Sequence, residues 1–126
     1  MIDKFGKVMI YVNEPRKVAD FWIEKLEFIE KDTQKIESRI LSVELTHSTM
    51  SDASIVLFDK HIVAQMSPEI PLTTPSILFT SYDIDKMREK LLRSDVTVGE
   101  IQAIGDAKTF NFADIEGNYF AVEEIK

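Results

Sequence analysis

The 126-residue chain contains no cysteine, only two histidines and four glycines, and no long apolar run. The lack of cysteine excludes disulfides, thiolate metal sites and cysteine nucleophiles. No segment approaches the roughly 20 apolar residues of a membrane-spanning helix, and residues 1–5 lack the apolar core of a secretory signal. The glycines are too scattered for a phosphate-binding or dinucleotide-binding loop. These absences predict a cytoplasmic protein with no membrane partner.

Basic residues are also few. The chain has 15 Lys and Arg against 22 Asp and Glu, a formal net charge of −7. Because nucleic-acid binding requires a basic surface, we expect no nucleic-acid partner. The acidic balance is compatible with a cationic ligand, although most acidic proteins owe their charge to solubility. A hydrophobic content of 44% and a charged content of 29% are typical of one ordinary globular domain.

An internal repeat organises the chain. A short apolar-alternating strand is followed by a helical apolar pattern, and the same succession returns in the second half at a constant offset. The residues that this offset relates are Val8 and Ile77, Ile10 and Phe79, Val18 and Met87, Trp22 and Leu91, Leu41 and Phe110, and Val43 and Phe112. Two copies of one supersecondary unit are the simplest interpretation.

Each copy is expected to run strand, helix and then three strands. In the first copy the strands are predicted at 7–13, 28–32, 39–47 and 53–59, and the helix at 15–26. The second copy opens with a strand near 76, followed by a helix at 84–94 and strands at 96–98, 108–113 and 119–125. Pro15 suits the first helical turn, with Asn13 or Glu14 as its cap, and Asp83 suits the N-cap of the second helix.

This organisation predicts an α+β fold. A single domain, 1–126, would consist of two βαβββ modules, about 1–60 and 75–126. Residues 61–74 contain prolines and little periodicity, so we predict a linker there. Alternation in the first strand places Val8, Ile10 and Val12 against the helix, with Lys7, Met9 and Tyr11 on the opposite, concave face. Two such half-barrels would enclose a cavity.

The end of the chain supplies the most informative motif. Residues 110–123 read as two strands joined by an Asp-x-Glu-Gly-Asn turn, in which Gly117 and Asn118 are residue types that tolerate a positive φ. This hairpin resembles the D-P-D-G-N-x-I-E-L hairpin of the glyoxalase/bleomycin-resistance/dioxygenase family, also called the vicinal oxygen chelate family. The stretches Val12-Asn13-Glu14, Phe21-Trp22, Leu26-Glu27-Phe28, Ser76-Ile77-Leu78-Phe79 and Asp83-Ile84-Asp85 resemble further signatures of that family in the same order.

The resemblance covers nearly the whole chain and implies paired βαβββ modules, usually assembled as homodimers. In metal-dependent members, four ligands come from the first and last strands of the modules. The matching positions here are Lys7, Val56, Ser76 and Ala121. Lysine is a cation, valine and alanine have no donor atom, and serine is a poor ligand for a divalent ion. We therefore expect no metal at this site and no cofactor.

Two details of the resemblance require separate interpretation. Val43-Glu44-Leu45-Thr46 is similar to the family's I-E-L-T ligand strand, but another apolar strand follows it before the linker. We therefore place Glu44 on the third strand and Val56 on the last; with the strands counted otherwise, Glu44 would be a ligand that lacks three partners. Glu27 stands where the family has a glycine that closes the first helix. It must adopt the left-handed conformation or end the helix differently.

The remaining candidates have competing roles. Lys7 could bind an anionic group, act as an amine nucleophile or pair with Glu44, and pairing is favoured. His47 and His61 lie at a strand end and in the predicted linker, which favours exposed or structural roles, and Glu123 reads as part of a solvated strand face. The aromatic and methionine candidates divide similarly: Trp22 fits the core, Tyr11 fits a pocket, and Met50 and Met66 could form an adaptable lid.

Taken with the resemblance, these residues predict a metal-independent protein of the bleomycin-resistance branch that sequesters a hydrophobic or cationic small molecule. The predicted cavity-lining residues are Lys7, Met9, Tyr11, Glu44, Val56, Phe58, Ser76 and Ala121. The main alternative is a lyase, isomerase or dioxygenase of the same fold, with a displaced metal or with acid–base chemistry by Glu44 and Lys7. A regulatory or interaction module with an exposed apolar patch is a third possibility.

Overall fold

The structure of the chain, a computed structural model, describes residues 1–125. They divide into two compact units, the first spanning Met1–Pro75 and the second beginning at Ser76. The division falls at the end of the segment that was predicted as a linker. Among the described residues, none of the helices has the length and apolar character that crossing a membrane requires.

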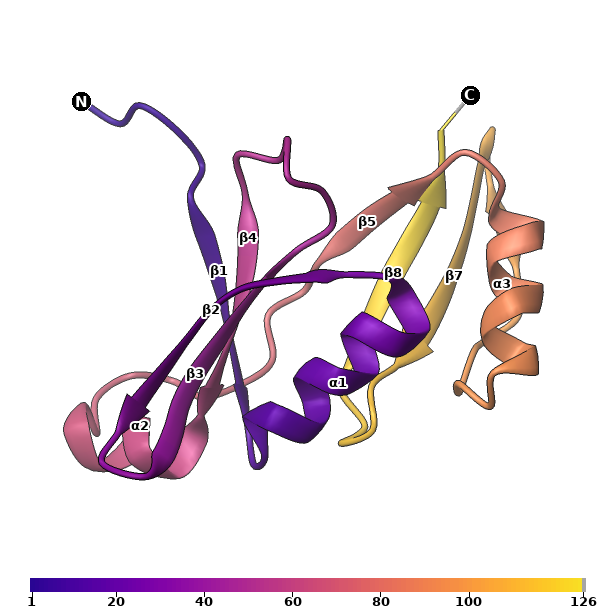
Figure 1. Ribbon diagram of the computed structural model, residues 1–126. Coiled ribbons are helices and arrows are strands. Elements are labelled where there is room, and N and C mark those ends of the chain that lie inside the picture. Colours follow the sequence, from indigo (N-terminus) through magenta and orange to yellow (C-terminus); the bar gives the residue numbers. More distant parts are fainter. Residues whose placement is uncertain (126) are drawn as a thin grey trace. The chain divides into compact units, whose positions relative to one another are not determined.

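The first unit is a four-stranded sheet with two helices (Figure 1). Its elements are β1 (Lys7–Val12), α1 (Pro15–Leu26), β2 (Ile29–Ile36), β3 (Arg39–Thr46), β4 (Ser54–Asp59) and α2 (Lys60–Met66). The strand order is β1-β4-β3-β2. β1 and β4 are parallel, and the other neighbouring pairs are antiparallel.

The second unit has the same topology with one helix. Its elements are β5 (Leu78–Ser81), α3 (Ile84–Arg93), β6 (Gln102–Ile104), β7 (Ala107–Ala113) and β8 (Tyr119–Glu124). The strand order β5-β8-β7-β6 repeats that of the first sheet, again with a parallel first pair. The predicted α+β fold of two βαβββ modules is confirmed.

Strand register corrects one part of the predicted repeat. Met9 pairs with Val56 as Leu78 pairs with Ala121, which confirms that Val56 and Ala121 hold equivalent positions. The next residues of these last strands, Leu57 and Val122, are therefore equivalent as well. Leu57 pairs with Val43, whereas Val122 pairs with Phe110. Val43 therefore corresponds to Phe110, and its predicted equivalence to Phe112 was wrong by two residues. The cause is a shorter connection between the helix and the third strand in the second unit.

The core of each unit lies between one face of its sheet and one helix. In the first unit α1 lies along one sheet face (Figure 1), and Ile10, Val43 and Leu57 are fully buried there together with Trp22 of the helix. Each fully buried side chain of this kind contributes about 1.5–3 kcal/mol. The second core is rich in aromatic residues; its buried side chains include Phe110, Phe112, Phe120, Val122, Ile84 and Leu91. Trp22 has the predicted core role.

Two predicted elements differ from the structure. Residues 96–98 form only an isolated bridge from Val98 to Phe112, and the second strand of that unit is β6 instead. β6 was missed because three exposed residues carry no alternation. The predicted linker 61–74 begins within a helix, α2. Asp59, which was predicted only as the last residue of a strand, is the N-cap of this helix.

Backbone conformation at the helix and strand ends explains several residue choices. Glu27 closes α1 with φ 61° and ψ 30°, so it does adopt the left-handed conformation. Asp83 caps α3 by accepting a hydrogen bond from Lys86 N, as predicted. In the closing turn Gly117 has a φ of +81°. Asn118 contributes its side chain instead, donating from Nδ2 to Asp114 Oδ2 over 2.9 Å.

Candidate functional site

The sheet face opposite α1 in the first unit carries six of the eight residues that were predicted to line a cavity between the modules. Residues paired across neighbouring strands point to the same face, and Lys7, Met9 and Tyr11 of β1 are in register with Ser54, Val56 and Phe58 of β4. Glu44 of β3 lies beside Val56. The face is divided into an apolar part near Tyr11 and an ionic part near Lys7.

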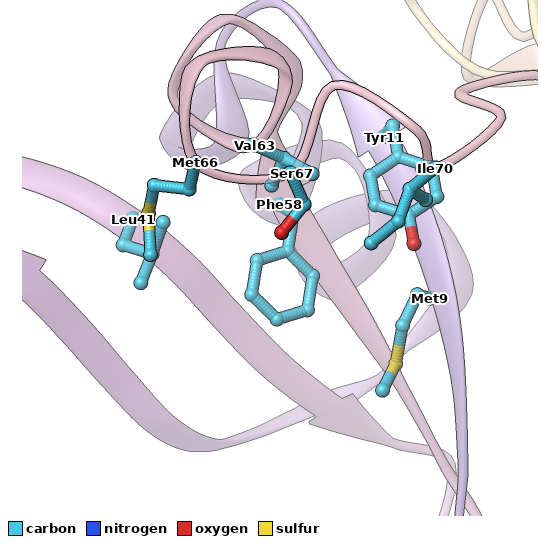
Figure 2. Close-up of a pocket in the computed structure, with 8 residues that line it drawn as sticks. All are labelled: Met9, Tyr11, Leu41, Phe58, Val63, Met66, Ser67 and Ile70. Atoms are coloured by element: carbon cyan, nitrogen blue, oxygen red, sulfur yellow. The ribbon is translucent and has the colours of Figure 1, made fainter.

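The apolar part forms a pocket of about 260 Å³ (Figure 2). Side chains from three strands form its floor, and α2 with the residues after it forms a wall. The lining residues are Met9, Tyr11, Leu41, Phe58, Val63, Met66, Ser67 and Ile70. Residues 61–74, predicted as a linker, therefore supply half of the pocket.

The wall is held in place from the end of β4. The Asp59 carboxylate, whose side chain is 8% exposed, accepts hydrogen bonds from the backbone N–H groups of His61 and Ile62. These bonds satisfy donors that the first turn of α2 leaves without helical partners. The other carboxylate oxygen pairs with Arg39 Nη2 at 3.1 Å. A short helix with a single buried residue, Ile62, is thus fixed to the sheet by its cap.

A register irregularity adds Leu41 to the floor of the pocket. β2 pairs Gln34 with Ser42 but the next residue, Lys35, with Ile40, so Leu41 is an additional residue of β3. A β-bulge of this kind locally turns the side chains of its strand. Leu41 lines the pocket although strict alternation from its neighbour Ser42 would direct it to the face covered by α1.

The chemistry of the pocket is that of an apolar, partly aromatic surface. The rings of Tyr11 and Phe58 lie with centroids 6.2 Å apart and tilted by 34°. Met9 and Met66 are 40% and 63% exposed, so apolar surface remains open to a ligand. Side-chain polar atoms enter the lining only as the hydroxyl groups of Tyr11 and Ser67. The Tyr11 hydroxyl is directed toward Met9 (Figure 2).

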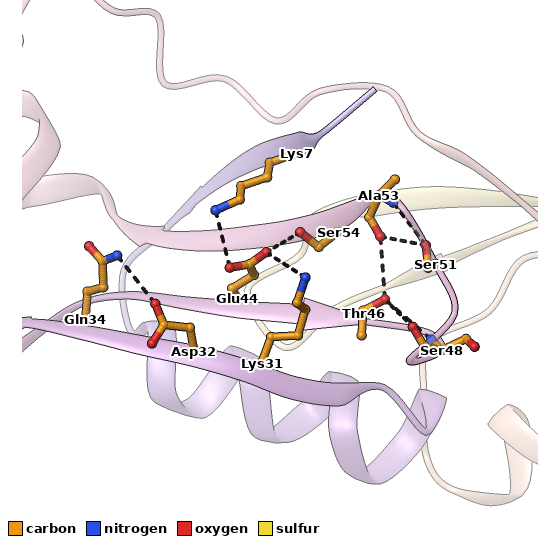
Figure 3. Close-up of polar contacts among 10 residues, drawn as sticks. All are labelled: Lys7, Lys31, Asp32, Gln34, Glu44, Thr46, Ser48, Ser51, Ala53 and Ser54. Atoms are coloured by element: carbon orange, nitrogen blue, oxygen red, sulfur yellow. Dashed lines mark hydrogen bonds and ion pairs between the residues drawn. The ribbon is translucent and has the colours of Figure 1, made fainter. Parts of the chain in front are cut away.

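The ionic part is centred on Glu44, whose side chain is only 11% exposed (Figure 3). Ser54 Oγ donates to Glu44 Oε2 over 2.6 Å. Lys7 Nζ lies 3.4 Å from Oε1, and Lys31 Nζ lies 3.6 Å from Oε2. The predicted ion pair between Lys7 and Glu44 is therefore present, with a serine and a second lysine added.

These contacts lower the pKa of Glu44 from its usual value. The hydrogen bond from Ser54 has the largest effect, and the two lysines also lower the pKa, while burial opposes them. A carboxyl group with a lowered pKa stays ionised and is a weaker proton acceptor than an ordinary glutamate. Glu44 is therefore suited to hold the Lys7 and Lys31 side chains, and less suited to the role of general base.

The predicted cavity-lining residues are divided in the structure among the pocket, the ionic cluster and the second unit. Met9, Tyr11 and Phe58 line the pocket, whereas Lys7 and Glu44 form the ionic cluster and Val56 is buried beside them. Ser76 and Ala121 belong to the second unit, where Ser76 precedes β5 and Ala121 lies in β8.

Other predicted candidates also have a place in the structure. Met66 lines the pocket, but Met50 is 88% exposed in the connection between β3 and β4, so only one of the two proposed lid methionines reaches it. Both histidines are exposed. The pocket residues that the sequence did not indicate are Leu41, Val63, Ser67 and Ile70. The apolar spacing of Ile62, Val63 and Met66 was an available signal for the residues in and after α2, whereas Leu41 depends on the bulge in β3.

The residues at the family's metal positions do not fit a divalent ion. Lys7 brings a positive charge, Val56 is buried without a donor atom, and Glu44 lies on the third strand, as predicted. Elsewhere within residues 1–125, one group of three carboxylates (Asp83, Asp85 and Glu124) lies close enough to share a cation. These oxygens already cap α3 at Lys86 N and Ile84 N and pair with Lys108.

Comparison with known proteins identifies the fold. No protein-family model matches the sequence, and no curated protein matches it significantly. Among solved structures, TnmS3, an antibiotic binding protein from Streptomyces sp. CB03234, is 20% identical with a TM-score of 0.80 and covers 99% of this chain and 98% of its own. A member of the glyoxalase/bleomycin resistance protein/dioxygenase superfamily from Sphaerobacter thermophilus DSM 20745 is 18% identical with a TM-score of 0.81, covering 98% of both chains.

An enzyme shares the same architecture. Lactoylglutathione lyase from Agrobacterium tumefaciens is 13% identical with a TM-score of 0.75, covering 98% of this chain and 94% of its own. At such identities the likeness establishes a common fold and leaves activity to be argued from the site. A member of the superfamily that the sequence resembles thus matches nearly the whole chain, so the predicted fold assignment is confirmed.

Proposed function

We propose that this chain, which has the fold of the glyoxalase/bleomycin resistance protein/dioxygenase superfamily, sequesters a flat hydrophobic small molecule without chemically changing it. The observation that carries the proposal is the pocket between β1, β4 and α2, lined by aromatic, methionine and aliphatic side chains. Apolar concave sites with few polar groups are typical of small-molecule binding. The antibiotic-binding neighbour of the same fold is consistent with this function.

The enzyme alternative has less support from the site. Glu44, the carboxylate considered as a base, has a lowered pKa and is occupied by Ser54 and Lys7. The metal positions carry residues that do not suit a divalent ion. The pocket lining offers two hydroxyl groups and no carboxylate, amine or imidazole, which supports binding without a chemical step.

The apolar lining also bears on the choice between a hydrophobic and a cationic ligand. None of the eight lining residues is acidic. A cation would lose its hydration in the pocket without gaining a carboxylate partner there. We therefore favour a hydrophobic ligand that stacks on Tyr11 and Phe58.

We further propose that the chain acts in the cytoplasm as a homodimer. In the described sheets β1, β2, β5 and β6 are edge strands, which a partner can cover. Exposed apolar side chains accompany several of them, such as Ile36 on β2 and Leu78 on β5. Two-fold symmetry is the commonest arrangement for such an assembly.

Fluorescence titration with the neutral dye N-phenyl-1-naphthylamine tests the binding function. The dye should bind in the micromolar range, and Met66→Glu should weaken binding at least tenfold because it places a charge in the apolar pocket. The matched control is Met50→Glu, the same substitution at a residue that is 88% exposed outside the pocket. Absence of dye binding, or equal loss in both variants, would contradict the proposal.

A further inference from the structure

The ionic part of the open sheet face adjoins the pocket, and the two exposed charges that pair with Glu44 are positive. Lys7 and Lys31 have side chains 52% and 48% exposed, whereas the Glu44 carboxylate between them is 11% exposed. A molecule approaching this face therefore meets two ammonium groups before it meets the carboxylate. Among these three paired residues, two lysines against one glutamate leave one positive charge in excess.

The lysines also retain hydrogen-bonding capacity. An ammonium group has three N–H donors, and the contacts from Lys7 and Lys31 to Glu44 are long, at 3.4 and 3.6 Å. Glu44 is held independently by Ser54 over 2.6 Å. Its carboxylate would thus stay in place if either lysine turned toward a ligand.

The distance between the two parts suits one ligand. Lys7, Met9 and Tyr11 alternate along one face of β1, so Lys7 lies about 13 Å from Tyr11 along the strand. Met9 lies midway and lines the pocket. A two- or three-ring molecule stacked on Tyr11 and Phe58 would extend past Met9 to the ammonium groups.

We infer that the site selects hydrophobic aromatic acids, with Lys7 and Lys31 as the subsite for the acidic group. This inference rests on the proposed binding function and specifies its ligand class. The apolar pocket binds the ring system, and the acid group takes the spare lysine donors at the edge of the sheet. An acid would gain a charged hydrogen bond there, whereas a cation would be repelled by the exposed ammonium groups.

Asp32 is the nearby carboxylate that opposes this selectivity. It is the register partner of Glu44 and is exposed, and its Oδ2 accepts a hydrogen bond from Gln34 Nε2 over 3.4 Å (Figure 3). Removing its charge should therefore strengthen the binding of an acid. Asp32→Asn is a variant whose predicted effect has the opposite sign to that of the lysine variants.

A matched pair of dyes tests the inference. 8-Anilinonaphthalene-1-sulfonate carries a sulfonate on the ring system of neutral N-phenyl-1-naphthylamine, so their affinity ratio isolates the acidic group. The sulfonate should bind about tenfold more tightly at low ionic strength, and this preference should shrink in 0.5 M NaCl. Lys7→Gln and Lys31→Gln should each reduce sulfonate affinity about threefold, as expected for half-exposed charges, and should leave affinity for the neutral dye unchanged.

The controls separate this inference from the binding function itself. Lys17→Gln makes the same change on α1, which covers the other sheet face, and should alter neither affinity. If the neutral dye binds but the sulfonate is not preferred, or if the lysine variants leave the preference intact, the acid subsite is refuted and the apolar pocket stands. If the cationic dye 9-aminoacridine binds more tightly than both, the charge selectivity is reversed and the inference fails. If none binds, the proposed function fails with it.

Discussion

Glu27 offers a sharp test of the local structure because one residue combines a glutamate side chain with a backbone conformation that favours glycine. It closes α1 with φ 61° and ψ 30°, and the N–H groups of Glu27 and Phe28 both donate to the Trp22 carbonyl. The same α1 contains Glu24, which is exposed and lies within the helix. The substitutions Glu27→Gly and Glu24→Gly therefore differ mainly in the backbone conformation at the site.

The expected free energies have opposite signs. A non-glycine residue in the left-handed conformation is strained by about 1 kcal/mol, and glycine removes this strain while adding about 0.4–1 kcal/mol of conformational entropy to the unfolded chain. Glu27→Gly should therefore be neutral or slightly stabilising. Glycine at position 24 relieves nothing and should cost about 0.5–1 kcal/mol. The two variants should differ by about 1 kcal/mol.

Urea unfolding followed by circular dichroism measures both variants against the unmodified chain. Asp95 supplies an independent replicate, since it has a φ of 63° just after α3, and Asp95→Gly should also be tolerated. Equal losses for Glu27→Gly and Glu24→Gly would show that Glu27 is unstrained, and would refute the interpretation of this helix end.

Four further predictions concern the ion cluster, the pocket wall, metal and assembly. Because the folded-state pKa of Glu44 lies below its usual 4.5, its ionised form stabilises the fold above that pH, and this contribution is lost as the pH falls through the lowered pKa. Glu44→Gln should therefore destabilise the chain at pH 7 but progressively less below pH 4.5. A loss of stability that does not depend on pH would contradict this prediction. Asp59→Ala should remove about 1 kcal/mol of capping and speed amide hydrogen exchange in α2, and unchanged exchange would argue against the cap. EDTA should leave the melting temperature unchanged, since no metal is linked to folding, and a fall of several degrees would refute this. Light scattering should give twice the chain mass, and the mass of one chain throughout the micromolar range would exclude the homodimer.

Sequence reasoning succeeded where a periodic pattern reflects a buried face. Alternation at Val8, Ile10 and Val12 and helical spacing at Val18 and Trp22 follow directly from packing one helix on one sheet. The duplication repeated that signal, so the βαβββ order could be predicted for both modules. The ion pair of Lys7 with Glu44 was also predictable, because both were expected on or near the same open face.

The rest depended on interactions that local pattern does not record. α2 has one buried residue, and its cap, Asp59, is held by Arg39, which lies 20 residues earlier in the chain. β2 continues to Ile36 through polar residues. The turn after it has Glu37 at a φ of 58°, so the sequence lacks the glycine or asparagine that would mark this turn. The bulge that turns Leu41 into the pocket arises only from pairing with β2. The pocket floor was thus partly predictable, and its wall was not.

The central claim is that a hydrophobic ligand occupies the pocket between β1, β4 and α2, and the methionines make it directly measurable. Methyl NMR of the chain labelled with ¹³C at its methionine methyl groups reports on Met9 and Met66, which line the pocket, and on Met50, which is 88% exposed away from it. Titration with N-phenyl-1-naphthylamine should shift the Met9 and Met66 signals together in a saturable way and leave Met50 unchanged. A ligand that binds and leaves Met9 and Met66 unshifted would place the binding site elsewhere and contradict the proposed function.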